Sequence, residues 1–294
     1  MMRCAALLAS LMAFAALASC QPGDRTRPDT AREFPRADRP VSDLGSNEFS
    51  TETARDNRGE AETVMDLAGI KPGMTVADIG AGEGYYTVRL AERVGSEGRV
   101  LAQDIDPDVL ARLGNRVERE RLDNVSIKLG EGDDPRLPAD SFDRIFLVHM
   151  YHEVQEPYAF LWRLWPAVRK GGQVIVVDVD RPTDQHGIAP LLLACEFKAV
   201  GFRLVAFRDA PELAGYYAQF EAIANRPEPD AIKPCRGIVS AEFQGFAADC
   251  LWRPGSVAAG RRRQGRIGDQ PQELRRLGCG GRHRHGQRGQ RRQL

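Results

Sequence analysis

Short apolar segments alternate with amphipathic segments along the middle of the chain, and this pattern limits the possible folds most strongly. Five strand-like segments occupy residues 74–79, 98–104, 125–130, 143–149 and 172–179. Helix-like segments separate them, among them 85–94, 107–120 and 157–168, and two further strand-like segments follow at 202–207 and 215–222. Strands that alternate with helices form a mainly parallel sheet covered on both faces. The sequence therefore predicts a doubly wound, seven-stranded α/β sheet over residues 55–225.

A glycine-rich motif lies where the first predicted strand meets the first helix. It reads D-I-G-A-G-E-G, from Asp78 to Gly84. Glycines allow a sharp backbone turn and the close approach of a ligand. A dinucleotide-binding fingerprint would require glycine at the position of Tyr85. The acid before the first glycine also suits a cationic amino group better than a pyrophosphate. The spacing therefore disfavours a nicotinamide oxidoreductase.

This stretch resembles motif I of class I S-adenosylmethionine-dependent methyltransferases. Residues 70–105 also resemble a bacterial subgroup of predicted methyltransferases. The resemblance implies a Rossmann-like sheet, S-adenosylmethionine as cofactor and methyl transfer as the activity. In this family the glycine loop contacts the methionine and ribose portions, and the first acid serves the amino end. The expected cofactor-binding residues are Asp78, Gly80, Ala81, Gly82, Gly84, Asp104, Ile105 and Asp133.

Acids also follow the second and third predicted strands. Asp104 ends the second strand, where a carboxylate can accept both ribose hydroxyls, whereas Asp106 is expected to cap the next helix. The resemblance gives Asp133, in preference to Asp134, a contact with the adenine amino group. We therefore expect the carboxylates of Asp78, Asp104 and Asp133 to line one crevice.

Two histidines follow the fourth predicted strand, which the resemblance places beside the transferring methyl group. His152 and His149 are the candidate catalytic residues, as general base or as cavity wall, and Glu153 could orient one of them. A metal site is the alternative, with His186 and Asp178 as further ligands. Because the two histidines lack the i, i+4 spacing of helical metal motifs, the sequence predicts no metal site.

The predicted function is methyl transfer to a small-molecule or lipid-like acceptor, which the sequence does not identify. The alternative is a catalytically inactive binding module of the same fold. The chain before Arg236 contains more acids than bases, because 13 arginines and no lysine lie from Arg236 onward. Nucleic acid is therefore not an expected partner. The oligomeric state is left open.

The first twenty residues resemble a secretory signal, with Arg3 before an apolar run. The segment from Leu17 to Cys20 resembles a bacterial lipobox. We expect a signal peptide over 1–20 and a lipid on Cys20 that anchors the protein to a membrane. The protein would then belong to the cell envelope and face the periplasm or exterior. An uncleaved N-terminal anchor is the alternative.

Residues 21–54 contain few apolar side chains and are expected to form a disordered tether. Residues 226–294, rich in arginine and glycine, are expected to be a disordered tail. Either a frameshift or a basic arm would explain that composition. Cys195 and Cys235 are the pair to test for a disulfide, and two free thiols are the alternative.

Overall fold

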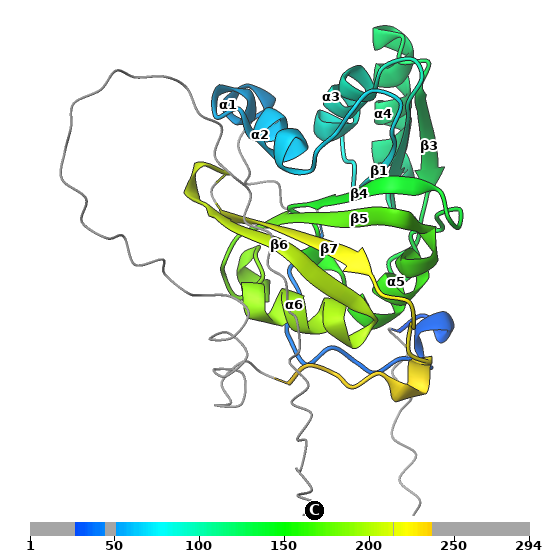
Figure 1. Cartoon of the computed structure of the whole chain (residues 1–294), viewed down its shortest axis with the longest axis vertical. Helices are drawn as coiled ribbons and strands as arrows, with labels where there is room; N and C mark the ends of the chain where they lie inside the picture. The colour runs from blue at the N-terminus through cyan, green and yellow to red at the C-terminus, as the bar shows by residue number, and fades with distance from the viewer. Residues whose placement is uncertain (1–26, 45–50, 214, 237–294) are drawn as a thin grey trace, which may run out of the picture.

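The computed structural model describes residues 27–44, 51–213 and 215–236, which contain a seven-stranded sheet (Figure 1). The strand order is β3-β2-β1-β4-β5-β7-β6. Strand β7 is antiparallel to β5 and β6, and the remaining neighbours are parallel, which confirms the predicted mainly parallel sheet. The strands are β1 (Thr75–Ile79), β2 (Arg99–Asp104), β3 (Val125–Leu129), β4 (Phe142–Val148), β5 (Val168–Asp178), β6 (Phe202–Ala210) and β7 (Gly215–Ala222).

Helices cover both faces of the sheet, with α1 to α4 on one side and α5 and α6 on the other (Figure 1). Successive strand residues supply the two cores, because their side chains point to opposite faces. Val76 packs in a cluster with Leu90 of α3, whereas Ala77 packs in a cluster with Leu161 of α5. The helices are α1 (Glu52–Asn57), α2 (Glu60–Leu67), α3 (Tyr85–Val94), α4 (Pro107–Glu120), α5 (Pro157–Leu164) and α6 (Pro190–Ala199).

Local signals explain where two helices begin and end. Helix α4 begins after Asp106, whose side chain accepts a hydrogen bond from the backbone N–H of Asp108 at 2.8 Å. Helix α5 was expected to continue to Val168 but ends at Leu164. A 3₁₀ turn (Trp165–Ala167) follows and contains Pro166, which has no N–H to continue an α-helix. The chain then enters β5 directly.

Residues 27–44 correct the prediction of a disordered tether. This N-terminal segment, defined as residues 27–44, contains a 3₁₀ turn, η1 (Asp29–Ala31), and packs on the α5–α6 side of the sheet. Phe34 is buried with its ring 5.5 Å from that of Trp162. Arg39 forms a buried ion pair with Glu196 of α6 at 2.8 Å. The prediction failed because long charged side chains, rather than an apolar pattern, fix the segment.

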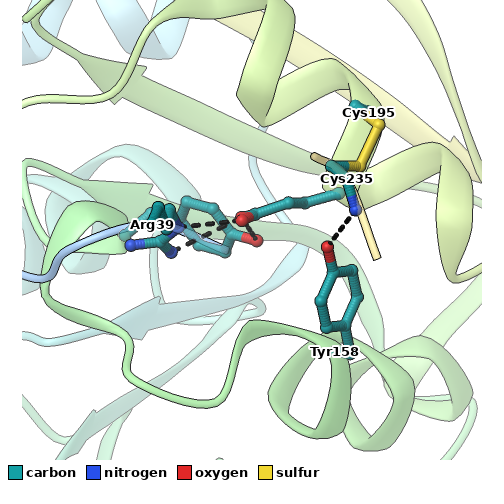
Figure 2. Close-up of a disulfide and its surroundings, with 6 residues drawn as sticks. Arg39, Tyr158, Cys195 and Cys235 are labelled. Carbon is teal, nitrogen blue, oxygen red and sulfur yellow. Dashed lines mark hydrogen bonds and ion pairs between the residues drawn. A yellow bond between two sulfur atoms is a disulfide. The ribbon is translucent and has the colours of Figure 1, made fainter. Parts of the chain in front are cut away.

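The residues after β7 also belong to the fold, although they were expected to begin a disordered tail. The guanidinium of Arg226 lies 3.4 Å above the centre of the Trp162 ring. Cys235 forms a disulfide with Cys195 of α6, and its backbone N–H donates to the Tyr158 hydroxyl at 2.7 Å (Figure 2). Of the two alternatives that the sequence left open for this pair, the structure has the disulfide.

The expected signal at 1–20 and the rest of the tail lie outside the described residues. Within the described ranges, no helix has both the length and the apolar character needed to cross a bilayer.

Candidate cofactor and acceptor site

A cavity of about 410 Å³ lies at the carboxyl edge of the sheet. Its walls include residues that follow β1, β2 and β4, and also Pro28 and Leu44 of the N-terminal segment. Strands β1 and β4 are neighbours in the sheet but not in the chain. The chain adds β2 and β3 on one side of β1 and then returns to add β4 on the other side. Doubly wound sheets bind their ligands outside the carboxyl ends of strands at this switch point.

The glycine loop forms one wall of the cavity. Gly80, Gly82 and Gly84 have φ angles of 67°, 56° and 90°, which residues with a Cβ rarely adopt. A Cβ on Gly84 would lie 2.5 Å from Leu113, whereas a Cβ on Gly82 would meet no atom within 4 Å. Gly80 and Gly82 line the cavity. The loop therefore leaves open space beside its backbone where a ligand can lie.

Asp104 forms the adjacent wall at the end of β2. Its Oδ2 accepts a hydrogen bond from the Gly82 N–H at 2.9 Å, and its Oδ1 accepts one from Ile105 at 2.7 Å. The Ile105 side chain is 38% exposed and also lines the cavity. A carboxylate and an apolar surface thus lie next to each other. A nucleoside can use both, the carboxylate for its ribose hydroxyls and the apolar surface for its base.

Asp78 does not line the cavity, contrary to the expected crevice of three carboxylates. Its side chain is 3% exposed and accepts a hydrogen bond from the Thr87 hydroxyl of α3 at 2.6 Å. Burial raises the pKa of Asp78 to about 6, and the charge of Asp104 adds to this effect. Asp78 therefore lies behind the glycine loop. Ala81 and Gly84 are likewise not part of the cavity wall.

Asp133 is also separated from the cavity wall, although its neighbours Glu131 and Gly132 line it. One carboxylate oxygen accepts hydrogen bonds from the Thr30 hydroxyl at 2.6 Å and from Arg163 at 2.7 Å. The other, Oδ1, is buried and has no hydrogen-bond partner among the residues that the structure describes. The N-terminal segment therefore covers Asp133, and the sequence did not predict this contact.

His149 and His152 differ in their surroundings. His149 has a φ angle of 53° and lines the cavity, with its Nε2 3.7 Å from Oε1 of Glu60. His152 is fully buried and does not line the cavity. Its Nδ1 lies 3.0 Å from Oδ1 of Asp178, and its Nε2 has no hydrogen-bond partner in the described part of the chain. Only His149 is therefore placed to meet an acceptor directly.

Glu60 of α2 is a site residue that sequence reasoning missed. It accepts hydrogen bonds from Arg55 at 2.6 Å and from the Tyr86 hydroxyl at 3.1 Å. Burial by itself would raise the pKa of Glu60, but bonds with His149 and Arg55 lower it to about 2. An ionised carboxylate therefore lies behind His149. The acidic residue is visible in the sequence, but no local pattern joins α2 to the end of β4.

A second cluster combines His152, Glu153 and His186, each of which offers a ligand atom within 4.8 Å of the others. The sequence predicted no metal site, because these residues lack a recognised motif. The structure brings them together by placing the turn after β5 against the turn after β4.

Comparison with known proteins connects this site to a family. Residues 76–172 match the family model described as a methyltransferase domain. Nocamycin O-methyltransferase of Saccharothrix syringae is 42% identical over 87 residues, which are 29% of this chain and 31% of that protein. A ubiquinone/menaquinone biosynthesis C-methyltransferase of Hydrogenovibrio crunogenus is 26% identical over 178 residues, which are 58% of this chain and 66% of that protein. The chain thus spans less than two thirds of these relatives.

Solved structures show the same fold at lower identity. A SAM-dependent methyltransferase from Aquifex aeolicus superimposes with a TM-score of 0.50 at 22% identity, covering 59% of this chain and 98% of that one. The cyclase SpnF superimposes with a TM-score of 0.51 at 16% identity, and the match covers 64% of this chain and 89% of that one. A fold does not define one reaction, so these likenesses support the architecture alone. Together with the family match, they show that residues 76–172 correspond to a methyltransferase domain within a chain of this fold.

Proposed function

We propose that the chain is an active methyltransferase that uses S-adenosylmethionine to methylate a small-molecule acceptor. The observation that carries this proposal is the cavity that the glycine loop and Asp104 form at the switch point of the sheet. Two relatives, named as a nocamycin O-methyltransferase and a ubiquinone/menaquinone biosynthesis C-methyltransferase, support a small organic acceptor.

The residues present fit the cofactor. Gly82 leaves open space beside its backbone, Gly80 also lines the cavity, and Asp104 can accept hydrogen bonds from ribose hydroxyls. The Oδ1 of Asp133 is buried without a donor in the described residues, but Asp133 lies outside the cavity wall and is given no contact with the cofactor. Asp78 acts from behind the loop, where it can hold the loop or a water molecule. When bound, the cofactor supplies a methyl group on a positively charged sulfur.

The acceptor lies at the end of the cavity bordered by His149, Met150 and Glu153. His149 takes the proton of the nucleophile, and the Glu60 carboxylate stabilises the resulting positive charge. Most of the catalysis comes from alignment of the nucleophile with the methyl group, which can contribute about 7–11 kcal/mol. His152 is buried behind this wall and does not itself line the cavity.

Titration of the full chain with S-adenosylhomocysteine tests the cofactor site, and the full chain is used because residues 27–44 form part of the cavity wall. We expect one binding site per chain. Transfer of a labelled methyl group to an envelope extract then tests activity. Absence of binding would contradict the proposal, whereas binding without transfer to any acceptor would favour the inactive binding module.

We also propose that the protein works in the cell envelope, held to a membrane by a lipid on Cys20. The lipobox-like residues from Leu17 to Cys20 support this location. The disulfide between Cys195 and Cys235 adds independent support, because disulfides persist mainly in oxidising compartments.

A further inference from the structure

We propose that His152, His186 and Glu153 bind a divalent transition-metal ion of the zinc class at the wall of the cofactor cavity. The ion holds the nucleophilic oxygen or sulfur of the acceptor. The role of the ion rests on the proposed methyl transfer, whereas the binding of the ion does not.

His152 provides the strongest observation. Its ring is fully buried, and its Nδ1 lies 3.0 and 3.1 Å from the two carboxylate oxygens of Asp178. Asp178 is itself buried and also accepts a hydrogen bond from the Val179 N–H at 2.8 Å. With the ring proton on Nδ1 toward Asp178, the lone pair lies on the buried Nε2, which has no protein partner in the residues described. A carboxylate behind one imidazole nitrogen and an unfilled position at the other is the usual setting of a metal-ligating histidine.

His186 completes a pair of imidazoles at right angles. Its ring centre lies 5.7 Å from that of His152, with an angle of 85° between the planes. Its backbone is held in the left-handed region at a φ of 53°, and its N–H donates to the buried Ser42 hydroxyl at 3.0 Å. The same hydroxyl donates to the carbonyl of Thr183 at 2.5 Å. The N-terminal segment therefore holds the turn that carries His186.

Glu153 provides the third ligand and connects the ion to the cavity. The three ligand atoms lie within 4.8 Å of one another. Small side-chain rotations would place each atom about 2.0–2.2 Å from one shared ion, which is the length of zinc bonds to nitrogen and oxygen. Two histidines and one carboxylate form a common zinc site with an open position. Because Glu153 also lines the cavity with Gly80, the ion lies where the acceptor binds.

The open position gives the ion a chemical role. A hydroxyl or thiol that binds the ion loses its proton more easily, and His149 takes that proton. The resulting anion forms a bond to the methyl carbon while the carbon–sulfur bond breaks, and the electron pair of that bond stays on the sulfur. The inference therefore predicts acceptors that carry a metal-binding oxygen or sulfur.

The test uses the purified full chain after treatment with a chelator, titrated with Co²⁺ alone. Visible absorption of the bound cobalt reports its ligands, and competition with Zn²⁺ gives the zinc affinity. We expect one cobalt ion per chain. His186→Ala and Glu153→Gln should each weaken binding on the order of 100-fold. Asp184→Asn is the matched control, because this exposed carboxylate lies in the same turn as His186 but outside the cluster.

Absence of a cobalt spectrum would overturn the metal site, and so would equal affinities in the wild type, Glu153→Gln and Asp184→Asn. Circular dichroism identifies a variant that fails to fold, and the second ligand variant then decides the question. Titration with S-adenosylhomocysteine separates the two proposals. Cofactor binding without cobalt binding contradicts only the metal site, and the reverse result contradicts only the proposed methyl transfer.

Discussion

Asp78 is a buried carboxyl group whose pKa is raised to about 6 by desolvation, against a usual value of 3.8. A raised pKa favours the protonated native state, so this contribution to stability is complete below pH 3.8 and is lost as the pH rises through about 6. Asp78→Asn should therefore stabilise the protein by about 3 kcal/mol at pH 7.5 and by less at pH 5. Urea unfolding at both pH values measures the difference.

The control for this prediction is Asp108→Asn, a change at an exposed carboxylate in the first turn of α4. Its effect on the free energy of unfolding should be small at both pH values. An Asp78→Asn variant that is equally destabilised at pH 5 and pH 7.5 would show that the carboxylate is needed for folding.

Asp104 is expected to contribute directly to cofactor affinity. Asp104→Asn removes the charge that would accept the ribose hydroxyls, and hydrogen bonds to charged groups are worth about 1.5–3 kcal/mol. Affinity for S-adenosylhomocysteine, measured by calorimetry, should fall about 10- to 100-fold. Asp106→Asn is the control, because Asp106 lines the same cavity and asparagine caps helices equally well. An equal loss in both variants would indicate a general effect of charge.

The sequence predicted the part of the site that local chain geometry determines. Gly80, Gly82, Asp104 and Ile105 line the cavity, because each lies at the carboxyl end of a strand or in the turn that directly follows it. Asp133 could not be placed correctly, because its covering residue Thr30 lies 103 positions away. No local spacing indicates such a contact.

At the level of whole elements, one buried ion pair, between Arg39 and Glu196, links the N-terminal segment to α6. Arg39 and Glu196 have side-chain exposures of 2% and 1%, so Arg39→Met would leave Glu196 buried without its partner cation. Such a loss typically costs about 3–5 kcal/mol. The double variant Arg39→Met, Glu196→Gln should recover much of this loss in the free energy of unfolding. A double variant no more stable than Arg39→Met would show that packing of Arg39 matters more than its charge.

The disulfide fixes the segment after β7 to α6. It closes a separation of 40 residues, for which the chain-entropy relation gives a stabilisation of about 4 kcal/mol. Replacing both Cys195 and Cys235 with serine should lower the free energy of unfolding by about 2–4 kcal/mol. Reducing agent should destabilise the wild type by a similar amount and leave the double variant unchanged. Equal sensitivity of both proteins to the reductant would contradict this prediction.

Helices were predicted more accurately than the terminal segments for a physical reason. The bounds of α3 and α4 agree with the sequence prediction, because glycines flank α3 at both ends and Asp106 and Pro107 mark the start of α4. Residues 27–44 have no helical or strand period, and partners far along the chain hold them. Sequence patterns report local order, so segments held only by distant side chains were interpreted as disordered.

For the whole molecule, the main prediction concerns its attachment. If Cys20 carries a lipid, the protein should sediment with membranes and incorporate labelled palmitate in a bacterial host. Cys20→Ser should release the protein to the soluble fraction and abolish labelling, without changing its affinity for S-adenosylhomocysteine. Membrane association that persists in Cys20→Ser would instead indicate an uncleaved N-terminal anchor.

The N-terminal segment also has a consequence for biosynthesis. Arg27 and Arg39 leave the ribosome early, but their partners Glu156 and Glu196 follow 129 and 157 residues later. Closing such long loops costs entropy and makes folding slow. The wall that Pro28 and Leu44 contribute to the cavity therefore forms only after α5 and α6 have been synthesised. A nascent chain has its glycine loop long before it has a closed binding site, so cofactor capture must follow synthesis of α6.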